Sequence, residues 1–523
     1  MQPASRLVWL GKIIRDYKIF PIVVVAVSVR LYGITYSAVW FDEAYSVLIS
    51  ETTPSLIRFH TAQDVHPPLY YFLLHFWMMF FGESVFSIRV MSALMGTLTV
   101  LVSVWLMGMI ASRRAAILAG FLSALLPIAV RYSQEARMYA LLALCCIAAT
   151  LMLVYWVKKP EHHRYLCAYA FFMVSGFYTH YFAFPCLVVH WLYLLFVRDR
   201  GQFLIRKGSW WIANLAMLVL YLPWIPLLIE QLGRTGGVGW IPPMSLLTVI
   251  SQIWIFFTLE PSSNWPIMAY LFVPLLAILV GWGLLKRDPD SHRFNLLIVL
   301  YTYGPILSMA LVSLKVPLFW TRYFLFSAMG LPLLIALSLD HLMNRSFRIG
   351  FLCLIAVVGA QAGGLYNVYS GTYWLNNPYQ RYETGIDKVV SYMNAQWAAG
   401  DRVLVYGSYL YPGAIYYSRR RTMPLLYTPG HELEGRPGRG SAGSFWYEDA
   451  DTLYMDSYTS VPVDTQRVWF IYETDLSTFD VPDHWRPISH FTSGDTQVWL
   501  YSLNPFHLAN SQRGKFHAVK QSH

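Results

Sequence analysis

Two adjacent carboxylates, Asp42 and Glu43, follow the first long apolar segment of the chain, in the run Trp40-Phe41-Asp42-Glu43-Ala44-Tyr45. Carboxylates are costly at a bilayer, so they are rare there unless they serve a function. A carboxylate in such a position can accept a proton from a reacting hydroxyl group. The pair therefore predicts a carboxylate-dependent site in an otherwise apolar chain.

Later polar segments carry side chains that could hold a phosphate group. Guanidinium groups match phosphate oxygens with paired hydrogen bonds, and they keep their charge at any relevant pH. The candidates for donor and phosphate binding are His66, Arg131, Glu135, Arg137, Tyr139, His180, Arg322 and Tyr323. Together with Asp42 and Glu43, they point to chemistry on a phosphate-linked substrate.

A structural alternative exists for each of the main candidates. Asp42 could cap an interfacial helix, and Glu43 could simply pair with an arginine. Glu135 could pair internally with Arg131 or Arg137. His66 could mark a helix break beside Pro67, His180 could be a packing residue, and Arg322 could be an interfacial anchor. Arg30, inside the first apolar segment, could reach the membrane surface or face the interior of a helical bundle.

Metal binding is left open by the sequence. Asp42, Glu43, Asp64, His66 and His180 offer oxygen and imidazole ligands. The chain has no HExxH or CxxC spacing, so no zinc site is predicted. A divalent cation stays possible, and no cofactor is required by any motif.

Composition identifies the elements that must position these residues. Of the 523 residues, 56% are hydrophobic and only 13% are charged, whereas soluble proteins carry about 25% charged residues. Basic residues outnumber acidic ones 26 to 14 in residues 1–364, but number 13 against 15 in residues 365–523. The excess of positive charge belongs to the apolar half, where it orients helices, and does not indicate nucleic-acid binding.

The basic clusters also predict a topology. Apolar segments lie near residues 18–36, 66–81, 88–110, 115–130, 140–157, 165–179, 182–197, 210–229, 264–285, 294–312, 322–340 and 348–364. If 66–81 is re-entrant or lies on the surface, every basic cluster falls on the cytoplasmic side. We therefore expect about eleven spanning helices, a cytoplasmic N-terminus and an external C-terminus. The loops that carry the candidate site residues then share the outer face.

Residues 365–523 are expected to form a separate extracytoplasmic α/β domain. Residues 387–397 have helical spacing, 414–418 can begin a helix, and 402–407, 468–472 and 497–501 have the pattern of buried strands. Residues 431–444 are rich in Gly, Pro and Arg and predict a loop. The first apolar segment lacks a cleavage site and is expected to stay as an anchor. The five cysteines all lie in apolar segments, so we expect no disulfide framework.

The outer-face motifs resemble those of the GT-C glycosyltransferases, most closely the bacterial family 39 type related to protein O-mannosyltransferases and lipid A aminoarabinose transferases. The motifs are WFDEAYS, HPPLYYFLLHFW, RYSQEARMYALL, YTHYF and PLFWTRYFLF, in this order within residues 30–340. The resemblance implies a helical membrane domain in residues 1–364. It also implies inverting transfer of a sugar from a polyprenyl-phosphate carrier to an acceptor at the outer face of the inner membrane. The acid at Asp42 matches the family's loop acid.

Two other function classes compete with this interpretation. A transporter or flippase of a lipid-linked sugar would also need charged groups, but near the middle of the membrane and within internal repeats. A membrane scaffold that presents the C-terminal domain would need no clustered acids and arginines. The sequence favours the glycosyltransferase and leaves the acceptor open as a glycan, a lipid or a protein hydroxyl.

Overall fold

The computed structural model describes residues 19–199, 201–233, 241–286, 292–371, 384–418, 423–428, 453–455, 457–462, 464–474 and 481–503. The chain divides into two compact units, which we call the helical unit (Met1–Tyr36 and Ile49–Tyr379) and the sheet unit (Ser37–Leu48 and Gln380–His523). The loop predicted at residues 431–444 lies outside the described residues.

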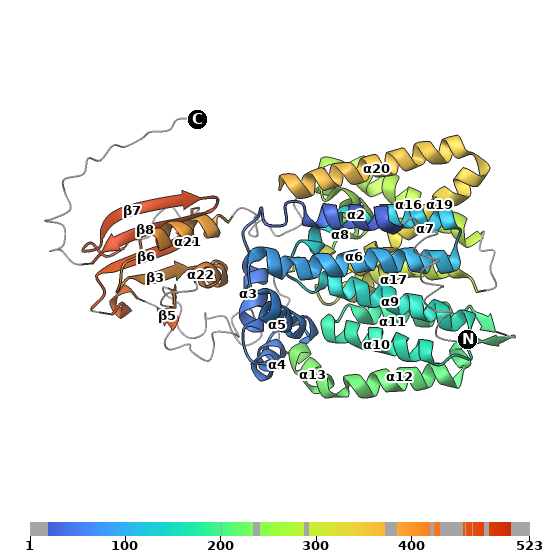
Figure 1. Ribbon diagram of the computed structural model, residues 1–523, viewed down its shortest axis with the longest axis horizontal. Coiled ribbons are helices and arrows are strands. Elements are labelled where there is room, and N and C mark those ends of the chain that lie inside the picture. The colour runs from blue at the N-terminus through green and yellow to red at the C-terminus, as the bar shows by residue number, and fades with distance from the viewer. Residues whose placement is uncertain are drawn as a thin grey trace. The chain divides into compact units, whose positions relative to one another are not determined.

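The helical unit consists almost entirely of helices (Figure 1). Its α-helices are α2 (Ile19–Leu31), α4 (Pro54–Gln63), α5 (Leu69–Phe81), α6 (Val85–Ile110), α7 (Arg113–Ala124), α8 (Pro127–Ser133), α9 (Tyr139–Lys158), α10 (Arg164–Thr179), α11 (Ala183–Leu194), α12 (Gly208–Tyr221), α13 (Ile225–Gly233), α14 (Leu246–Ile250), α15 (Gln252–Thr258), α16 (Val273–Lys286), α17 (Phe294–Ser313), α18 (Leu325–Ala328), α19 (Gly330–Arg345) and α20 (Phe347–Ser370). Shorter turns include η2 (Leu222–Trp224), η5 (Thr321–Phe324) and the ribbon β1 (Arg198–Asp199) with β2 (Gln202–Phe203).

Seven helices in the described part of the chain are long and apolar enough to cross a membrane, or eight if α7 and α8 form one bent span. The expected spans near 18–36, 165–179 and 182–197 correspond to α2, α10 and α11, with 13, 16 and 12 residues. At 1.5 Å per residue these helices are shorter than the apolar core of about 30 Å. A polytopic helical protein is confirmed, and the count of eleven spans stays a prediction.

The segment expected to span at 115–130 is instead two helices, α7 and α8, bent by 54°. Pro127 begins α8 at a position where its missing N–H costs nothing. The bend brings Arg131 onto the last turn of a short helix rather than into a loop. Similarly, α5 begins directly after Pro67-Pro68 and has only 13 residues, too few to span.

Arg30 faces the interior of the helical unit, which decides between its two alternatives. It is fully buried on α2 and donates hydrogen bonds to the backbone oxygens of Ala26 and Ala124 and to Ser133 Oγ. Gly96 on α6 makes room for this contact, since a Cβ there would lie 2.1 Å from Ser133 Oγ and 2.9 Å from Arg30 Nε. Arg30 thus fixes the end of α8 close to Arg131.

The long helices α6, α9, α10 and α11 lie beside one another and form the centre of the helical unit (Figure 1). The most buried of the apolar helices that could span is α9, with 83% of its apolar window inside the protein, whereas α16 and α20 are 17% buried and expose their side chains to the surroundings. The central helices therefore hold the connecting turns on which the candidate site residues lie.

The sheet unit has an α/β fold with a six-stranded sheet in the order β5-β4-β3-β6-β8-β7. Strands β5, β4, β3 and β6 run parallel, and β8 pairs antiparallel with both β6 and β7. The elements are α3 (Phe41–Ser50), α21 (Ile386–Ala395), β3 (Arg402–Tyr406), α22 (Tyr411–Ser418), β4 (Leu425–Tyr427), β5 (Tyr454–Met455), β6 (Arg467–Glu473), β7 (Arg486–Ser493) and β8 (Thr496–Ser502). The predicted α/β class is confirmed, and β7 is a strand that the sequence pattern did not reveal.

Helix α3 comes from the N-terminal part of the chain, far in sequence from the other elements of the sheet unit. Its residues up to Leu48 belong to that unit. The backbone N–H of Val39 donates to the Tyr417 hydroxyl at 2.8 Å, and the ring of Phe41 stacks on Tyr409 with centroids 5.5 Å apart. The acidic pair Asp42 and Glu43 lies in the first turn of this helix.

Candidate active site

The link between α4 and α5 presents a paired carboxylate and imidazole. Asp64 ends α4, and the Nδ1 atom of His66 lies 3.1 Å from Asp64 Oδ2. Their side chains are 8% and 12% exposed. Burial raises the pKa of Asp64, but the hydrogen bond and charge of His66, with a contribution from Arg137, outweigh burial and lower it. Asp64 is therefore ionised and orients the His66 ring.

The turn between α8 and α9 supplies a buried ion pair and a second arginine. A guanidinium nitrogen of Arg131 lies 2.6 Å from Glu135 Oε1, and both side chains are almost completely buried. Arg137 is also buried. The Gln134 side chain fixes this turn by donating to the backbone oxygens of Arg30 and Tyr32. The internal pairing considered for Glu135 is thus present, within a turn that also carries Arg137.

An aromatic network joins the connecting turns. The ring of His180 lies 5.5 Å from His66, 6.0 Å from Tyr139 and 5.1 Å from Tyr323, measured between centroids. The Arg322 guanidinium lies 5.8 Å from the centre of the Tyr139 ring. Four segments of the helical unit therefore meet at one place: the α4–α5 link, the α8–α9 turn, the α10–α11 link and η5.

We call this group the polar cluster, and it contains all eight residues predicted to bind the donor. Its members are Asp64, His66, Arg131, Tyr132, Glu135, Arg137, Tyr139, His180, Arg322 and Tyr323. Asp42 and Glu43 belong to the sheet unit and are described with it. Glu43 is fully buried there and Asp42 is half-buried. The roles of these residues stay predictions.

The electrostatics of the polar cluster favour an anion. Three guanidinium groups, those of Arg131, Arg137 and Arg322, face two carboxylates, Glu135 and Asp64, and all five side chains are buried. Burial lowers the pKa of His180 well below its ordinary value, and the charges of His66, Arg137 and Arg322 lower it further. His180 is therefore neutral, and the three guanidinium groups are the cationic donors of the polar cluster.

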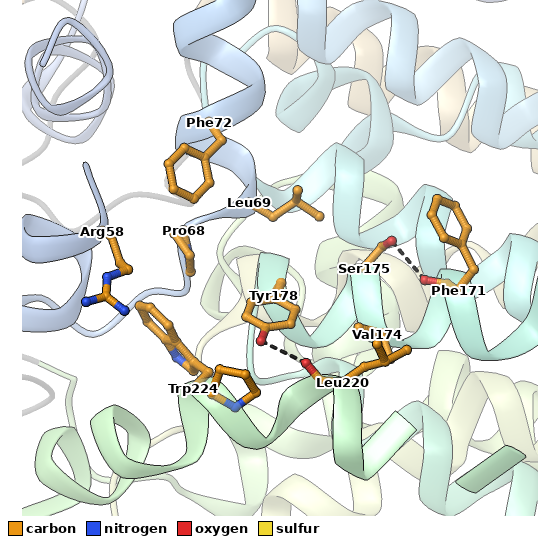
Figure 2. A pocket seen from close by; sticks show the side chains of 11 residues that line it. Arg58, Pro68, Leu69, Phe72, Phe171, Val174, Ser175, Tyr178, Leu220 and Trp224 are labelled. Atoms are coloured by element: carbon orange, nitrogen blue, oxygen red, sulfur yellow. Dashed lines mark hydrogen bonds between the residues drawn. The ribbon is translucent and has the colours of Figure 1, made fainter. Parts of the chain in front are cut away.

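An apolar groove of about 430 Å³ is lined by residues close in sequence to two members of the polar cluster (Figure 2). Pro68, which lines it, comes two residues after His66, and Tyr178, on its other side, comes two residues before His180. The Tyr178 hydroxyl donates to the backbone oxygen of Leu220 at 3.0 Å, which closes one wall. The lining residues are Arg58, Pro68, Leu69, Phe72, Phe171, Val174, Ser175, Tyr178, Leu220, Pro223 and Trp224.

Sequence reasoning missed Tyr132 and the groove. Tyr132 lies in the quoted motif RYSQEARMYALL, next to Arg131. Its ring lies 5.4 Å from Tyr139, and its buried hydroxyl has no hydrogen-bond partner among the described residues. The groove has no sequence signal, because its walls come from α5, α10 and the α12–η2 turn, whose apolar residues look like ordinary membrane-facing positions.

The structure bears on the divalent cation that the sequence left possible. In the residues that the structure describes, no three His, Cys, Asp or Glu side chains converge in a way that could hold a metal ion. Asp64 and His66 form a two-member group. The described residues thus do not fit a protein-held metal, and we derive no step through one.

Comparisons with known proteins agree with the motifs. Residues 65–227 match the family described as dolichyl-phosphate-mannose-protein mannosyltransferase. The structure of ArnT from Cupriavidus metallidurans in the apo state is similar, with a TM-score of 0.61 and 14% identity over 92% of this chain and 97% of that chain. ArnT from the same organism bound to undecaprenyl phosphate gives a TM-score of 0.61 and 13% identity over 93% and 98%.

The apo oligosaccharyltransferase from Archaeoglobus fulgidus is also similar, with a TM-score of 0.51 and 11% identity over 95% of this chain and 75% of that chain. No curated protein matches the sequence significantly. The resemblance to GT-C glycosyltransferases is therefore confirmed, and the fold is of the GT-C type.

Proposed function

We propose that this protein is an inverting glycosyltransferase that moves a sugar from a polyprenyl-phosphate carrier to an acceptor hydroxyl at the outer face of the membrane. The single observation that carries the proposal is the polar cluster, a buried site with three arginines, whose link and turn residues lead in sequence into an apolar groove. A polyprenyl-phosphate sugar combines an anionic headgroup with a long apolar chain, so it complements both parts.

The polar cluster offers several donors to an anion. Arg131, Arg137 and Arg322 are all buried, and guanidinium groups bind phosphate oxygens through charge-assisted hydrogen bonds. The Tyr132 hydroxyl, which has no hydrogen-bond partner among the described residues, could donate a further hydrogen bond. A phosphodiester anion would therefore find both charged and neutral donors in the polar cluster.

The groove fits the apolar part of the same ligand. Most of its lining is aliphatic or aromatic, and the planar Trp224 and Phe72 side chains face it (Figure 2). An isoprenoid chain leaving the phosphate near His66 would reach Pro68 and Leu69 first. The comparisons support this proposal, because one of the similar ArnT structures is described as bound to undecaprenyl phosphate.

The proposed chemistry needs a base and a stabilised leaving group. The acceptor hydroxyl must lose a proton, and the resemblance assigns this role to Asp42, with Glu43 as the alternative. The bond between the anomeric carbon and the phosphate oxygen breaks, and the polar cluster would stabilise the departing phosphate. The sugar can be a hexose or a pentose, and the acceptor can be a glycan, a lipid or a protein.

We further propose residues 1–364 as the catalytic membrane domain of an inner-membrane protein and residues 365–523 as an extracytoplasmic domain. Asp483 is exposed on the sheet unit, so Asp483→Cys with Cys167 replaced by serine provides a label site. A membrane-impermeant maleimide should label it in intact spheroplasts. Labelling only in inverted vesicles would place the C-terminal domain in the cytoplasm.

The proposal is tested by sugar release from a radiolabelled polyprenyl-phosphate sugar by the purified protein in detergent. Release that depends on an added acceptor supports a transferase. Carrier-linked sugar that crosses the bilayer of reconstituted liposomes without being cleaved would instead establish the flippase alternative.

The groove can be tested in the same assay. Val174→Trp fills the groove and should raise the KM for a long-chain donor more than for a donor with two isoprene units. Val312→Trp, at an exposed apolar position on α17, is the matched control and should leave both KM values unchanged. An equal effect on both donors would remove the groove from the chain-binding site.

A further inference from the structure

The polar cluster contains two histidines whose surroundings differ. His180 Nδ1 accepts a hydrogen bond from the backbone N–H of Phe182 at 3.1 Å, so its proton lies on Nε2. Burial and nearby cations keep this ring neutral, as its lowered pKa shows. His180 can therefore donate a hydrogen bond but cannot supply a proton as an imidazolium ion.

His66 has the opposite environment. Its Nδ1 faces the ionised Asp64 carboxylate, which fixes the ring and stabilises a positive charge on it. The arrangement leaves Nε2 as the nitrogen for a ligand. Its ring lies 5.5 Å from the neutral His180, so one histidine of the pair is held neutral and the other is supported as a cation. Such a separation of roles is typical of acid–base sites.

We propose that His66, oriented by Asp64, is the general acid that protonates the departing polyprenyl phosphate. The inference rests on the proposed function and assigns the fate of the leaving group. Donor cleavage converts a phosphodiester with one negative charge into a phosphate monoester with up to two, so the phosphate gains charge during the reaction. A proton supplied at that moment favours the products.

The protons and electrons balance without any co-reactant. The acceptor oxygen gives its proton to the carboxylate base and forms a bond to the anomeric carbon. The bond between that carbon and the phosphate oxygen breaks, and its electron pair stays on the phosphate. The imidazolium of His66 gives its Nε2 proton to this oxygen and becomes neutral. The base then loses its proton to water and His66 regains one, which completes the cycle.

Other charged and titratable groups that face His66 come from all elements packed around it. Asp64 lies on the same link as His66. The α8–α9 turn contributes Arg131, Glu135, Arg137 and Tyr139. His180 and Tyr181 come from the α10–α11 link, and Arg322 and Tyr323 come from η5. The arginines bind the phosphate but keep their protons at all relevant pH values. Among the described members of the polar cluster, His66 is thus the imidazole that a carboxylate orients through Nδ1, which leaves its Nε2 for the leaving phosphate.

The test compares His66→Gln and Asp64→Asn with the parent in purified full-length protein. Glutamine can still donate a hydrogen bond but cannot transfer a proton. His66→Gln should lower kcat by roughly a hundredfold or more, the usual contribution of a general acid, with little change in the KM for the donor.

Asp64 acts as a positioning residue, and its signature is a loss in kcat without a loss in donor binding. Asp64→Asn should reduce kcat less than His66→Gln and leave the KM for the donor unchanged, because the His66 ring loses the hydrogen bond that orients it. His75→Gln is the matched control. His75 contacts the backbone oxygen of Ser50 from α5 and is not part of the cluster, so this variant should keep the kcat and KM of the parent.

Binding of polyprenyl phosphate, measured by a fluorescent analogue in the same preparations, separates the possible failures. If the parent neither binds this product nor releases sugar, the proposed function fails and the general acid with it. If the parent is active but His66→Gln keeps its kcat, the general acid alone is overturned. A loss of binding in His66→Gln with unchanged kcat also overturns it, because His66 is then only a ground-state phosphate ligand.

Discussion

Asp64 in the helical unit and Asp401 in the sheet unit are both buried carboxylates with basic partners, but their networks differ. Arg467 donates to both oxygens of Asp401, at 2.8 and 2.6 Å. Trp469 Nε1 and the backbone N–H of Ala398 add hydrogen bonds of 2.8 and 3.0 Å. One negative charge meets one positive charge, so the Asp401 network is complete within the protein.

The polar cluster around Asp64 is built differently. Three buried arginines and two buried carboxylates come from several connecting segments, and the Tyr132 hydroxyl has no hydrogen-bond partner among the described residues. A single arginine–carboxylate pair within one sheet stabilises the fold, whereas several guanidinium groups gathered from different segments can bind a phosphate group. The comparison predicts that Asp401 matters for stability and that the polar cluster matters for donor binding.

The largest effect is expected for the proposed base, Asp42. Asp42→Asn keeps the size of the side chain but removes its basicity, so turnover should fall by roughly a hundredfold or more with unchanged carrier affinity. Asp387→Asn is the matched control, since Asp387 is also half-buried and also lies in the first turn of a helix, α21. Near-normal turnover of Asp42→Asn would move the role of base to Glu43 or Glu135.

Asp401→Ala should produce the largest loss of stability. Breaking a fully buried ion pair costs 3–5 kcal/mol, and we expect about 2–3 kcal/mol here because the Arg467 side chain is 28% exposed and regains some hydration. Thermal unfolding of the sheet unit can be followed by tryptophan fluorescence in the full chain. Asp483→Ala, at an exposed position of the same unit, should unfold like the parent.

The same Asp401→Ala protein should bind carrier as the parent does wherever it is folded. Weaker carrier binding at temperatures at which the sheet unit is folded would contradict the division between a stabilising network and a ligand-binding cluster.

Arg322 tests whether the polar cluster binds the carrier phosphate. Arg322→Ala removes a charge-assisted hydrogen bond worth about 1.5–3 kcal/mol, so carrier affinity should fall roughly ten- to a hundredfold. Arg322→Lys should recover only part of this, because an ammonium lacks the planar fork of a guanidinium. Arg164→Ala, at an exposed position on α10, is the control. Parent-like affinity in both Arg322 variants would make Arg322 an interfacial anchor.

The convergence of these residues could be expected from the sequence because they lie at the ends of apolar segments. Arg131, His180 and Arg322 each lie at the boundary of an apolar segment, and the topology predicted from the basic clusters puts these boundaries on one face. Residues of this kind are informative because a charged side chain next to an apolar segment is costly to keep unless it has a structural or functional role.

Other features could not be predicted because they depend on tertiary packing. The break between α7 and α8 is visible in the sequence only as Pro127 inside an apolar run, which is compatible with a continuous kinked helix. The sequence does not decide whether Arg30 reaches the membrane surface or faces the interior of the bundle. The space beside Gly96 and the hydrogen bond to Ser133 Oγ place it inside. Strand β7 has no clear alternation of apolar and polar residues, since it lies at an edge of the sheet and most of its side chains are exposed.

The smallest effect is expected for a third ion pair, which is neither fully buried nor part of the polar cluster. Arg114 Nε lies 2.6 Å from Asp340 Oδ1, with side chains 37% and 15% exposed. Arg114 also donates to the backbone oxygen of Asp340 at 2.8 Å, a bond that Asp340→Asn would retain. A partly exposed pair is usually worth less than about 1 kcal/mol. Asp340→Asn should therefore shift thermal unfolding only slightly and leave carrier affinity and turnover at parent values. A loss of carrier affinity comparable with that of Arg322→Ala would show that a charge outside the polar cluster controls donor binding. The contrast between the Asp401 network and the polar cluster would then no longer explain where the donor binds.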